Sequence, residues 1–228
     1  MKPKLLLLHG ALGSKKQLVP IKNLLKEQFD VYTLDFEGHG EYLSNNEFSM
    51  ALFSQNVIDF LDTEGIDSIH IFGYSMGGYV ALQTALEASH RIDKIVTLGT
   101  KFDWSVASAE KEVRMLNPDK IEAKVPHFAQ QLKDQHHPQD WKTVMHKTAD
   151  MMLGLAHGNA LDEQALKQIN HHVSIGLGSL DNMVSLEEST LAAQTLPQAS
   201  LVQLPDVKHP IGQIAPTVLA KYIRESLG

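Results

Sequence analysis

Short apolar stretches alternate along the chain with longer segments in which apolar residues recur every three to four positions. The short stretches are typical of buried strands and the longer segments of amphipathic helices, so their order predicts parallel strands joined by crossover helices. The strands lack a clean apolar and polar alternation, which indicates a sheet covered by helices on both faces. We expect strands at 4–9, 30–36, 68–73, 94–99, 173–178 and 200–205.

The segment 100–168 interrupts this rhythm. It contains no convincing strand and is rich in Lys, Glu, Gln, His and Met. Asn117 precedes Pro118 as a cap precedes the first residue of a helix, and Pro126 and Pro138 are further candidate helix starts. We therefore expect this segment to be helical.

The division of the chain follows from that interruption. We expect an α/β core formed by residues 1–99 and 169–228, with residues 100–168 inserted as a helical lid between the fourth and fifth strands. A final helix is expected to open at Pro216 and to turn Val218, Tyr222 and Ile223 inward.

Composition and charge narrow the class of protein. At 228 residues, with 43% hydrophobic and 21% charged residues, the chain is expected to fold as one ordinary domain. The net charge of -7, with no basic cluster, argues against nucleic acid and anionic membranes as partners. The first leucine run is too short for a signal peptide, and the absence of cysteine excludes disulfides. We expect a cytoplasmic monomer or homodimer whose partner is a small molecule.

Ser75 lies at the junction of a strand pattern and a helix pattern, in the stretch FGYSMGGYVA. Gly73 and Gly77 leave room for a sharp turn that lifts the serine above the sheet edge, the nucleophile elbow G-x-S-x-G. This turn puts Ser75 at a helix N-terminus, where N–H groups favour developing negative charge. The Met76 N–H is therefore a candidate oxyanion donor. The alternative is that Ser75 only caps the helix.

A second oxyanion donor is expected in the stretch LLLLHGALGS, where a strand ends and the backbone turns away. A loop beside the elbow strand exposes an N–H group there, and Ala11 is the candidate. We expect His9 to brace this loop by hydrogen bonding and not to take part in catalysis.

A serine nucleophile needs a histidine that takes its proton and a carboxylate that orients the histidine. His209 lies between the last strand and the final helix, so it is expected at the same sheet edge as Ser75. Asp181 follows the fifth strand and is the candidate acid. Asp103 and Asp206 are the alternatives for that role.

Neither a metal nor a cofactor is expected. Adjacent histidines occur at 136–137 and at 171–172, but adjacent side chains point apart and no His-x-x-x-His or cysteine pattern accompanies them. The histidines of the inserted segment are interpreted as solvated or lid residues; they are His127, His136, His137, His146 and His157.

The motifs together resemble the α/β-hydrolase family in its single-domain, lid-bearing form. HGALGS, LDFEGHG, GYSMGG, GSLDNMVS and VKHP occur in the family's order and approximate spacing over essentially all 228 residues. The resemblance implies a mostly parallel sheet of about six strands and a catalytic triad of Ser75, Asp181 and His209. It also implies oxyanion donors at Ala11 and Met76. Because the chain begins at the strand carrying LLLLHG, we expect the family's first two strands to be missing.

The neighbours of Ser75 narrow the reaction within that family. Haloalkane dehalogenases and epoxide hydrolases have an aspartate at the serine position. Carbon–carbon hydrolases typically have Asn where this chain has Tyr74, and the menaquinone-pathway lyases usually have Arg where it has Tyr79. We therefore expect a carboxylesterase-like enzyme that cleaves a small to medium, largely apolar ester or thioester through an acyl-enzyme.

Two alternatives stay open: a carbon–carbon bond hydrolase or lyase with the same triad, and a small-molecule receptor with negligible turnover. Apolar residues of the lid are expected either to shape the pocket or to attach the lid to the core. They are Trp104, Met115, Phe128, Trp141, Met145, Met151, Met152 and Leu155.

Overall fold

The computed structural model describes residues 2–228 and contains one sheet of six strands, all parallel, in the order β2-β1-β3-β4-β5-β6. Each expected strand is present, with its ends shifted by at most three residues. The strands are β1 Lys4–Leu8, β2 Asp30–Thr33, β3 Ile69–Tyr74, β4 Ile92–Leu98, β5 His172–Gly178 and β6 Ala199–Leu204.

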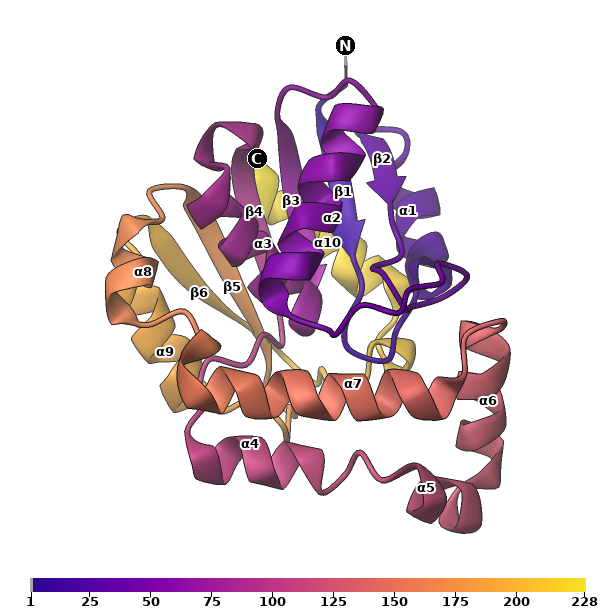
Figure 1. Ribbon diagram of the computed structural model, residues 1–228. Helices are drawn as coiled ribbons and strands as arrows, with labels where there is room; N and C mark the ends of the chain where they lie inside the picture. Colours follow the sequence, from indigo (N-terminus) through magenta and orange to yellow (C-terminus); the bar gives the residue numbers. More distant parts are fainter. Residues whose placement is uncertain (1) are drawn as a thin grey trace.

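Helices cover both faces of this sheet (Figure 1), as the lack of strict alternation predicted. The leucines of β1 explain the pattern, because Leu6 and Leu8 pack into one buried cluster while Leu5 and Leu7 pack into the other. One face carries α2 (Met50–Thr63), α3 (Met76–Glu87) and α9 (Leu186–Thr195), and the other carries α1 (Val19–Leu25) and α10 (Pro216–Leu227).

A helical insertion lies between β4 and β5 and crosses the carboxyl ends of the strands (Figure 1). Its helices are α4 Val106–Val113, α5 Pro118–Lys124, α6 Pro126–His136 and α7 Trp141–Gly154, and α8 Glu163–Gln168 leads back to the sheet. Single 3₁₀ turns occur at Lys15–Leu18, Ser89–Arg91 and Ile211–Gln213, and a π turn at Leu155–Asn159.

Two of the three expected helix starts in the insertion are confirmed. Asn117 caps α5 by accepting the Lys120 N–H, and α6 begins at Pro126. The third was wrong, because α7 begins at Trp141 and not at Pro138. The Asp140 carboxylate accepts two backbone N–H groups there, and such a cap satisfies donors that a proline only removes.

The last helix begins at Pro216 and buries Tyr222 and Ile223, both as expected, but it does not bury Val218. Val218 is 40% exposed, whereas Leu219 is buried beside Tyr222 and Ile223. The expectation for Val218 was therefore wrong. The buried positions recur every three to four residues from Leu219, as the geometry of a helix requires.

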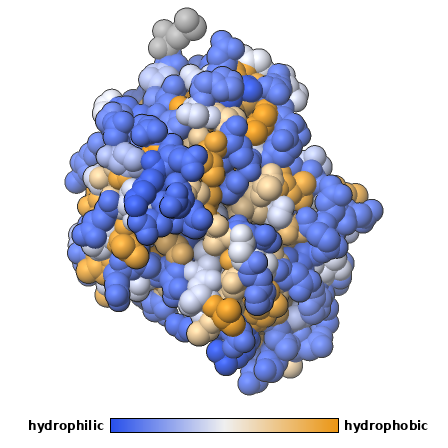
Figure 2. Space-filling model, turned by 60° about the vertical axis from the view of Figure 1, so that its left-hand side comes forward, coloured by the Kyte–Doolittle hydropathy of each residue, from blue (hydrophilic) through white to orange (hydrophobic). Residues whose placement is uncertain are grey.

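The surface carries no continuous apolar belt on the face that Figure 2 presents, where hydrophobic residues form separate groups among hydrophilic ones. Within residues 2–228, no helix combines the length and the hydropathy needed to cross a membrane.

Candidate active site

Ser75 occupies the turn between β3 and α3 with a strained backbone. Its φ of 52° and ψ of -117° lie in a region that residues with a side chain rarely adopt. The Ser75 N–H donates to the carbonyl oxygen of Leu98, at 2.8 Å, which ties the turn to β4. Strain of this kind persists only where the surroundings hold it, and it is concentrated at functional sites.

The glycines on either side of Ser75 are required by close backbone packing. A Cβ on Gly73 would lie 2.3 Å from the carbonyl oxygen of Gly77, and one on Gly77 would lie 2.6 Å from that of His9. Neither position has room for a side chain. The start of α3 therefore packs directly against the end of β1.

His209 and Asp181 are paired at the carboxyl end of the sheet. The Nδ1 of His209 lies 2.8 Å from Oδ2 of Asp181, and Oδ1 accepts the Met183 and Val184 N–H groups at 2.8 and 2.9 Å. Burial alone would raise the pKa of Asp181, but the hydrogen bond and charge of His209, with the two backbone donors, hold it below its ordinary value. The carboxylate therefore stays ionised beside the imidazole.

The alternative acids have other contacts. Asp103 accepts the Ser105 N–H at 3.0 Å, and the N–H of Asp206 donates to the hydroxyl of Ser179 at 2.8 Å. Neither carboxylate is a hydrogen-bond partner of His209.

Tyr74 supports His209 in a way that the sequence did not suggest. Its hydroxyl donates to the His209 carbonyl oxygen at 3.0 Å, and burial raises the pKa of Tyr74 to about 12, which keeps the hydroxyl protonated. A tyrosine at the end of a buried strand needs a partner for its hydroxyl, and that requirement was the available signal. The contact fixes the loop of His209 against the residue that precedes Ser75.

The candidate oxyanion donors, Ala11 and Met76, line the same cavity as Ser75. Within residues 2–228 neither backbone N–H donates a hydrogen bond. Met76 is the first residue of α3, where N–H groups have no intrahelical partner. Both groups are thus available to an anionic oxygen in the cavity.

His9 joins the loop of Ala11 to the neighbouring loop. Its Nε2 accepts the Phe36 N–H at 3.2 Å, so the proton is on Nδ1, which donates to the carbonyl oxygen of Gly10 at 2.8 Å. Burial lowers the pKa of His9 to about 4, so the ring is neutral at ordinary pH.

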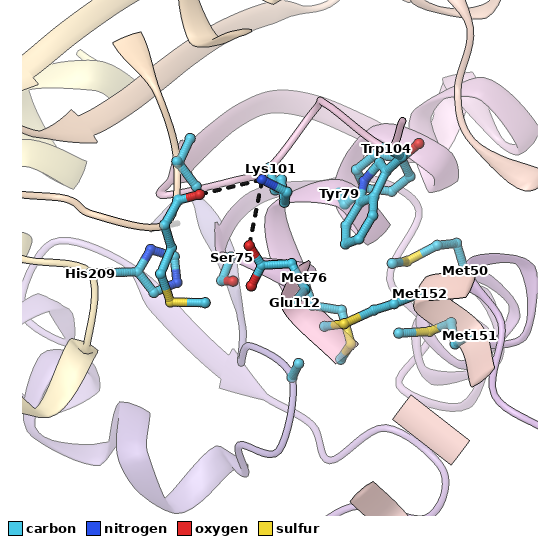
Figure 3. A pocket seen from close by; sticks show the side chains of 13 residues that line it. Met50, Ser75, Met76, Tyr79, Lys101, Trp104, Glu112, Met151, Met152 and His209 are labelled. Atoms are coloured by element: carbon cyan, nitrogen blue, oxygen red, sulfur yellow. Dashed lines mark hydrogen bonds and ion pairs between the residues drawn. The ribbon is translucent and has the colours of Figure 1, made fainter. Parts of the chain in front are cut away.

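Ser75 and His209 line a cavity of about 40 Å³. Figure 3 shows the side chains around it. Of the apolar residues expected in the lid, Trp104, Met151 and Met152 line it. The others lie elsewhere: Met115 and Phe128 are exposed, Trp141 and Met145 pack within the insertion, and Leu155 packs in the core. The full lining is Ala11, Met50, Ser75, Met76, Tyr79, Lys101, Trp104, Glu112, Met151, Met152, Met183, Val184 and His209.

Two charged residues of this lining, Lys101 and Glu112, were missed by sequence reasoning. The Lys101 Nζ donates to the Met183 carbonyl oxygen at 3.3 Å and lies 3.7 Å from Oε1 of Glu112 (Figure 3). Signals for both existed in the sequence. Lys101 follows the carboxyl end of β4, where ligand-binding residues of such sheets gather, and Glu112 shares the buried side of α4 with Ala109.

The fold and the arrangement around Ser75 define a class of protein. Residues 3–138 match the family model described as alpha/beta hydrolase fold. The chain belongs to that family, because the match covers more than half of its length.

Individual relatives agree with this assignment. The chain is similar to a probable alcohol acetyltransferase of Wickerhamomyces anomalus, with 32% identity over 96 residues, which cover 41% of this chain and 28% of that protein. It is also similar to Esterase YbfF of Escherichia coli, with 30% identity over 94 residues, which cover 41% of this chain and 37% of that protein. These alignments thus span less than two fifths of each relative.

A solved structure extends the likeness to the whole fold. A thermophilic esterase from Thermogutta terrifontis superposes with a TM-score of 0.79 at 21% identity, and the match covers 100% of this chain and 90% of that one. At this level of identity the likeness concerns the fold alone.

Proposed function

We propose that this chain is a serine hydrolase that cleaves small to medium, largely apolar carboxylic esters or thioesters through an acyl-enzyme on Ser75. The observation that carries the proposal is that Ser75, on a strained turn, shares a cavity with His209, whose Nδ1 lies 2.8 Å from the Asp181 carboxylate. An oriented imidazole beside a serine is the arrangement that acyl transfer requires.

The steps follow from the groups in the cavity. His209 takes the proton of the Ser75 hydroxyl as its oxygen attacks the ester carbonyl, and the N–H groups of Ala11 and Met76 stabilise the oxyanion. Asp181 stabilises the imidazolium. The alcohol leaves with the proton that His209 returns, and water then attacks the acyl-enzyme by the same route.

The insertion is assigned a role in the same proposal. Residues 100–168 act as a lid on a core formed by residues 1–99 and 169–228. Trp104, Met151 and Met152 support this role, because they bring apolar surface of that segment to the cavity. Unbranched methionine side chains adapt to acyl or alcohol groups of different shape.

Replacement of the proposed nucleophile tests the proposal. Ser75→Ala should lower kcat/KM for p-nitrophenyl butanoate by about 10³-fold or more, because no other group in the cavity replaces the serine oxygen. Steady-state hydrolysis, with a thioester in parallel, measures this loss. The wild-type chain should also be labelled by a fluorophosphonate at Ser75, and the variant should not.

Other outcomes would overturn the proposal. Wild-type rates in Ser75→Ala would exclude the serine as nucleophile. Turnover of a vinylogous diketone without ester hydrolysis would assign a carbon–carbon hydrolase or lyase instead. Labelling without turnover of any ester would indicate a receptor.

A further inference from the structure

The Lys101–Glu112 pair lies inside the cavity of Ser75 and has no part in the proposed hydrolysis. The two side chains are only 14% and 4% exposed, and the remaining wall is mostly apolar. A buried ion pair loses hydration that an apolar pair of similar size would not lose. Packing of the wall alone therefore does not account for these two residues.

Glu112 differs from the other carboxylate near Lys101 in its hydrogen bonds. Glu188, whose Oε1 lies 4.0 Å from the Lys101 Nζ, accepts the Ser185 N–H and two backbone N–H groups that follow β4. The Glu112 carboxylate accepts none within residues 2–228, and its Oε1 is a buried oxygen without a hydrogen-bond partner. Glu188 thus has a structural role, whereas Glu112 presents an unused acceptor in the cavity.

Lys101 has unused donors beside that acceptor. Its ammonium group carries three N–H donors, and within residues 2–228 one hydrogen bond, to the Met183 carbonyl oxygen, is formed at 3.3 Å. The distances to the two carboxylates, 3.7 and 4.0 Å, exceed that of a hydrogen bond. A ligand atom next to Glu112 is therefore also within reach of a donor from Lys101.

The group that fits this corner must donate to Glu112 and accept from Lys101. A carboxylate has no donor, and the local charge of two carboxylates and one ammonium already favours exclusion of a further anion. An ammonium has no acceptor and would lie against the Lys101 cation. A hydroxyl is both donor and acceptor, and it is small enough for a cavity of about 40 Å³.

We propose that Lys101 and Glu112 recognise a hydroxyl group of the substrate, so that the substrate class is hydroxylated esters or thioesters. This inference rests on the proposed hydrolysis at Ser75. Glu112 accepts the hydroxyl proton and Lys101 donates to the hydroxyl oxygen. Both residues act on specificity and neither takes part in the acyl transfer.

Matched pairs of esters test this inference, one pair for each half of the substrate. p-Nitrophenyl 3-hydroxybutanoate is compared with p-nitrophenyl butanoate, and 2-hydroxyethyl acetate with propyl acetate. In at least one pair the wild-type chain should prefer the hydroxylated ester by about tenfold or more in kcat/KM, as expected for a hydrogen bond to a charged group.

Substitution of Glu112 assigns that preference to the pair. Glu112→Leu should bring the ratio in that pair to about one, and Glu112→Gln, which keeps an acceptor oxygen, should retain part of the preference. Glu110→Leu is the matched control, because Glu110 lies on the exposed side of the same helix and should leave the ratio unchanged.

Several results would overturn the inference. Wild-type ratios of one or less in both pairs would do so, as would an unchanged ratio in Glu112→Leu, since a purely structural role affects both esters of a pair equally. Preference for an acidic or an amino-substituted ester would also contradict it. Failure of the hydrolysis itself is distinguishable: no ester is cleaved and Ser75 is not labelled, whereas failure of this inference leaves plain esters cleaved.

Discussion

Gly77 positions the proposed nucleophile because it has no Cβ. A Cβ there would lie 2.6 Å from the carbonyl oxygens of both Leu8 and His9. These are backbone atoms at the end of the interior strand β1, which is hydrogen-bonded to β2 and β3, so moving them costs free energy. The absence of a side chain at position 77 therefore sets the distance between the Ser75 turn and the loop of Ala11.

Gly77→Ala should for this reason impair both stability and activity. We expect the free energy of unfolding to fall by about 1–3 kcal/mol, as in overpacked cores, and ester hydrolysis to fall with it. Urea denaturation and steady-state hydrolysis measure the two effects. Gly212→Ala is the matched control, since no atom beyond its own stretch of chain lies within 4 Å of its Cβ position, and a change within about 0.5 kcal/mol is expected there. Equal losses in the two variants would contradict this account.

The residues around Ser75 differ in how far the sequence reveals them. The turn of Ser75 with Gly73 and Gly77 was predictable, because its strain and its relief lie within a few neighbouring positions. Tyr74 was not recognised as a support of His209, since its partner lies 135 positions away. The pairing of Lys101 with Glu112 was missed for a related reason: each position carried its own signal, but nothing in the sequence joins a residue of the loop after β4 to a residue of an inserted helix.

Trp104, in the segment between β4 and α4, separates two cavities that lie between different helices and loops. Its indole lines the cavity of about 40 Å³ at Ser75 and also a cavity of about 510 Å³ beside α8 and α9. Its Nε1 is buried without a hydrogen-bond partner, so no polar contact holds the ring in place. The size of the proposed substrate pocket therefore depends on this one side chain.

Trp104→Ala should join the two cavities and shift the preferred acyl chain toward longer esters. A series of p-nitrophenyl esters from acetate to dodecanoate measures the shift, and the maximum of kcat/KM should move by several carbons. Met115→Ala is the matched control, because Met115 belongs to the same insertion but is 50% exposed. An unchanged chain-length profile in Trp104→Ala would exclude the ring as the limiting wall.

Helix starts show which element boundaries were predictable. Pro118 follows a capping asparagine and Pro216 follows a strand and loop, and both begin helices. Pro138 does not, because the Asp140 carboxylate two positions later caps α7. Proline indicates that a helix can begin, whereas the side chain that satisfies the first N–H groups decides where it does.

Three histidines, His9, His39 and His136, are fully buried and join the insertion to the core. The expectation that His136 is solvated was therefore wrong. The ring centroids of His9 and His39 lie 5.2 Å apart, and those of His39 and His136 lie 5.7 Å apart. His136, on α6, accepts the Gly40 N–H at its Nδ1 and donates from Nε2 to the carbonyl oxygen of Leu12. These contacts use the neutral ring, because Nδ1 cannot accept when it carries a proton.

Acid should weaken the folded chain through this cluster. Burial lowers the pKa of all three histidines, to about 4 for His9, so the unfolded chain binds protons below about pH 6.5 while the folded chain does not. The stabilisation is present above that pH and is lost as the pH falls toward the folded pKa. His9 should contribute a slope of about 1.4 kcal/mol per pH unit within this window, and His39 and His136 should add to it in the same direction.

Urea denaturation at pH 7.5 and pH 5 measures this loss. His136→Gln should reduce the difference between the two pH values, because one titrating ring is removed. His127→Gln on the same helix is the matched control, since the exposed His127 is not part of the cluster. Equal unfolding free energies at the two pH values would show that the three histidines do not make the folded chain sensitive to acid.

The sheet and its helical insertion were predictable as a whole, whereas the cluster of His9, His39 and His136 was not. Strand and helix periodicity is a property of each segment, so six strands and an interruption of the rhythm could be recognised. His39 and His136 lie almost a hundred positions apart and belong to different elements. Their meeting depends on how the insertion returns to the sheet, which periodicity does not specify.

Met183 forms hydrogen bonds with both the proposed catalytic acid and Lys101, and this limits how the cavity can be redesigned. Its N–H donates to Asp181 and its carbonyl oxygen accepts from Lys101, so one residue connects the orientation of His209 to the charged corner of the cavity. A change at Lys101 intended to broaden the substrate range should therefore also slow the enzyme on every substrate. Trp104 forms no hydrogen bond with Met183 and no ion pair with Lys101 within residues 2–228, so libraries that vary Trp104 should separate selectivity from rate.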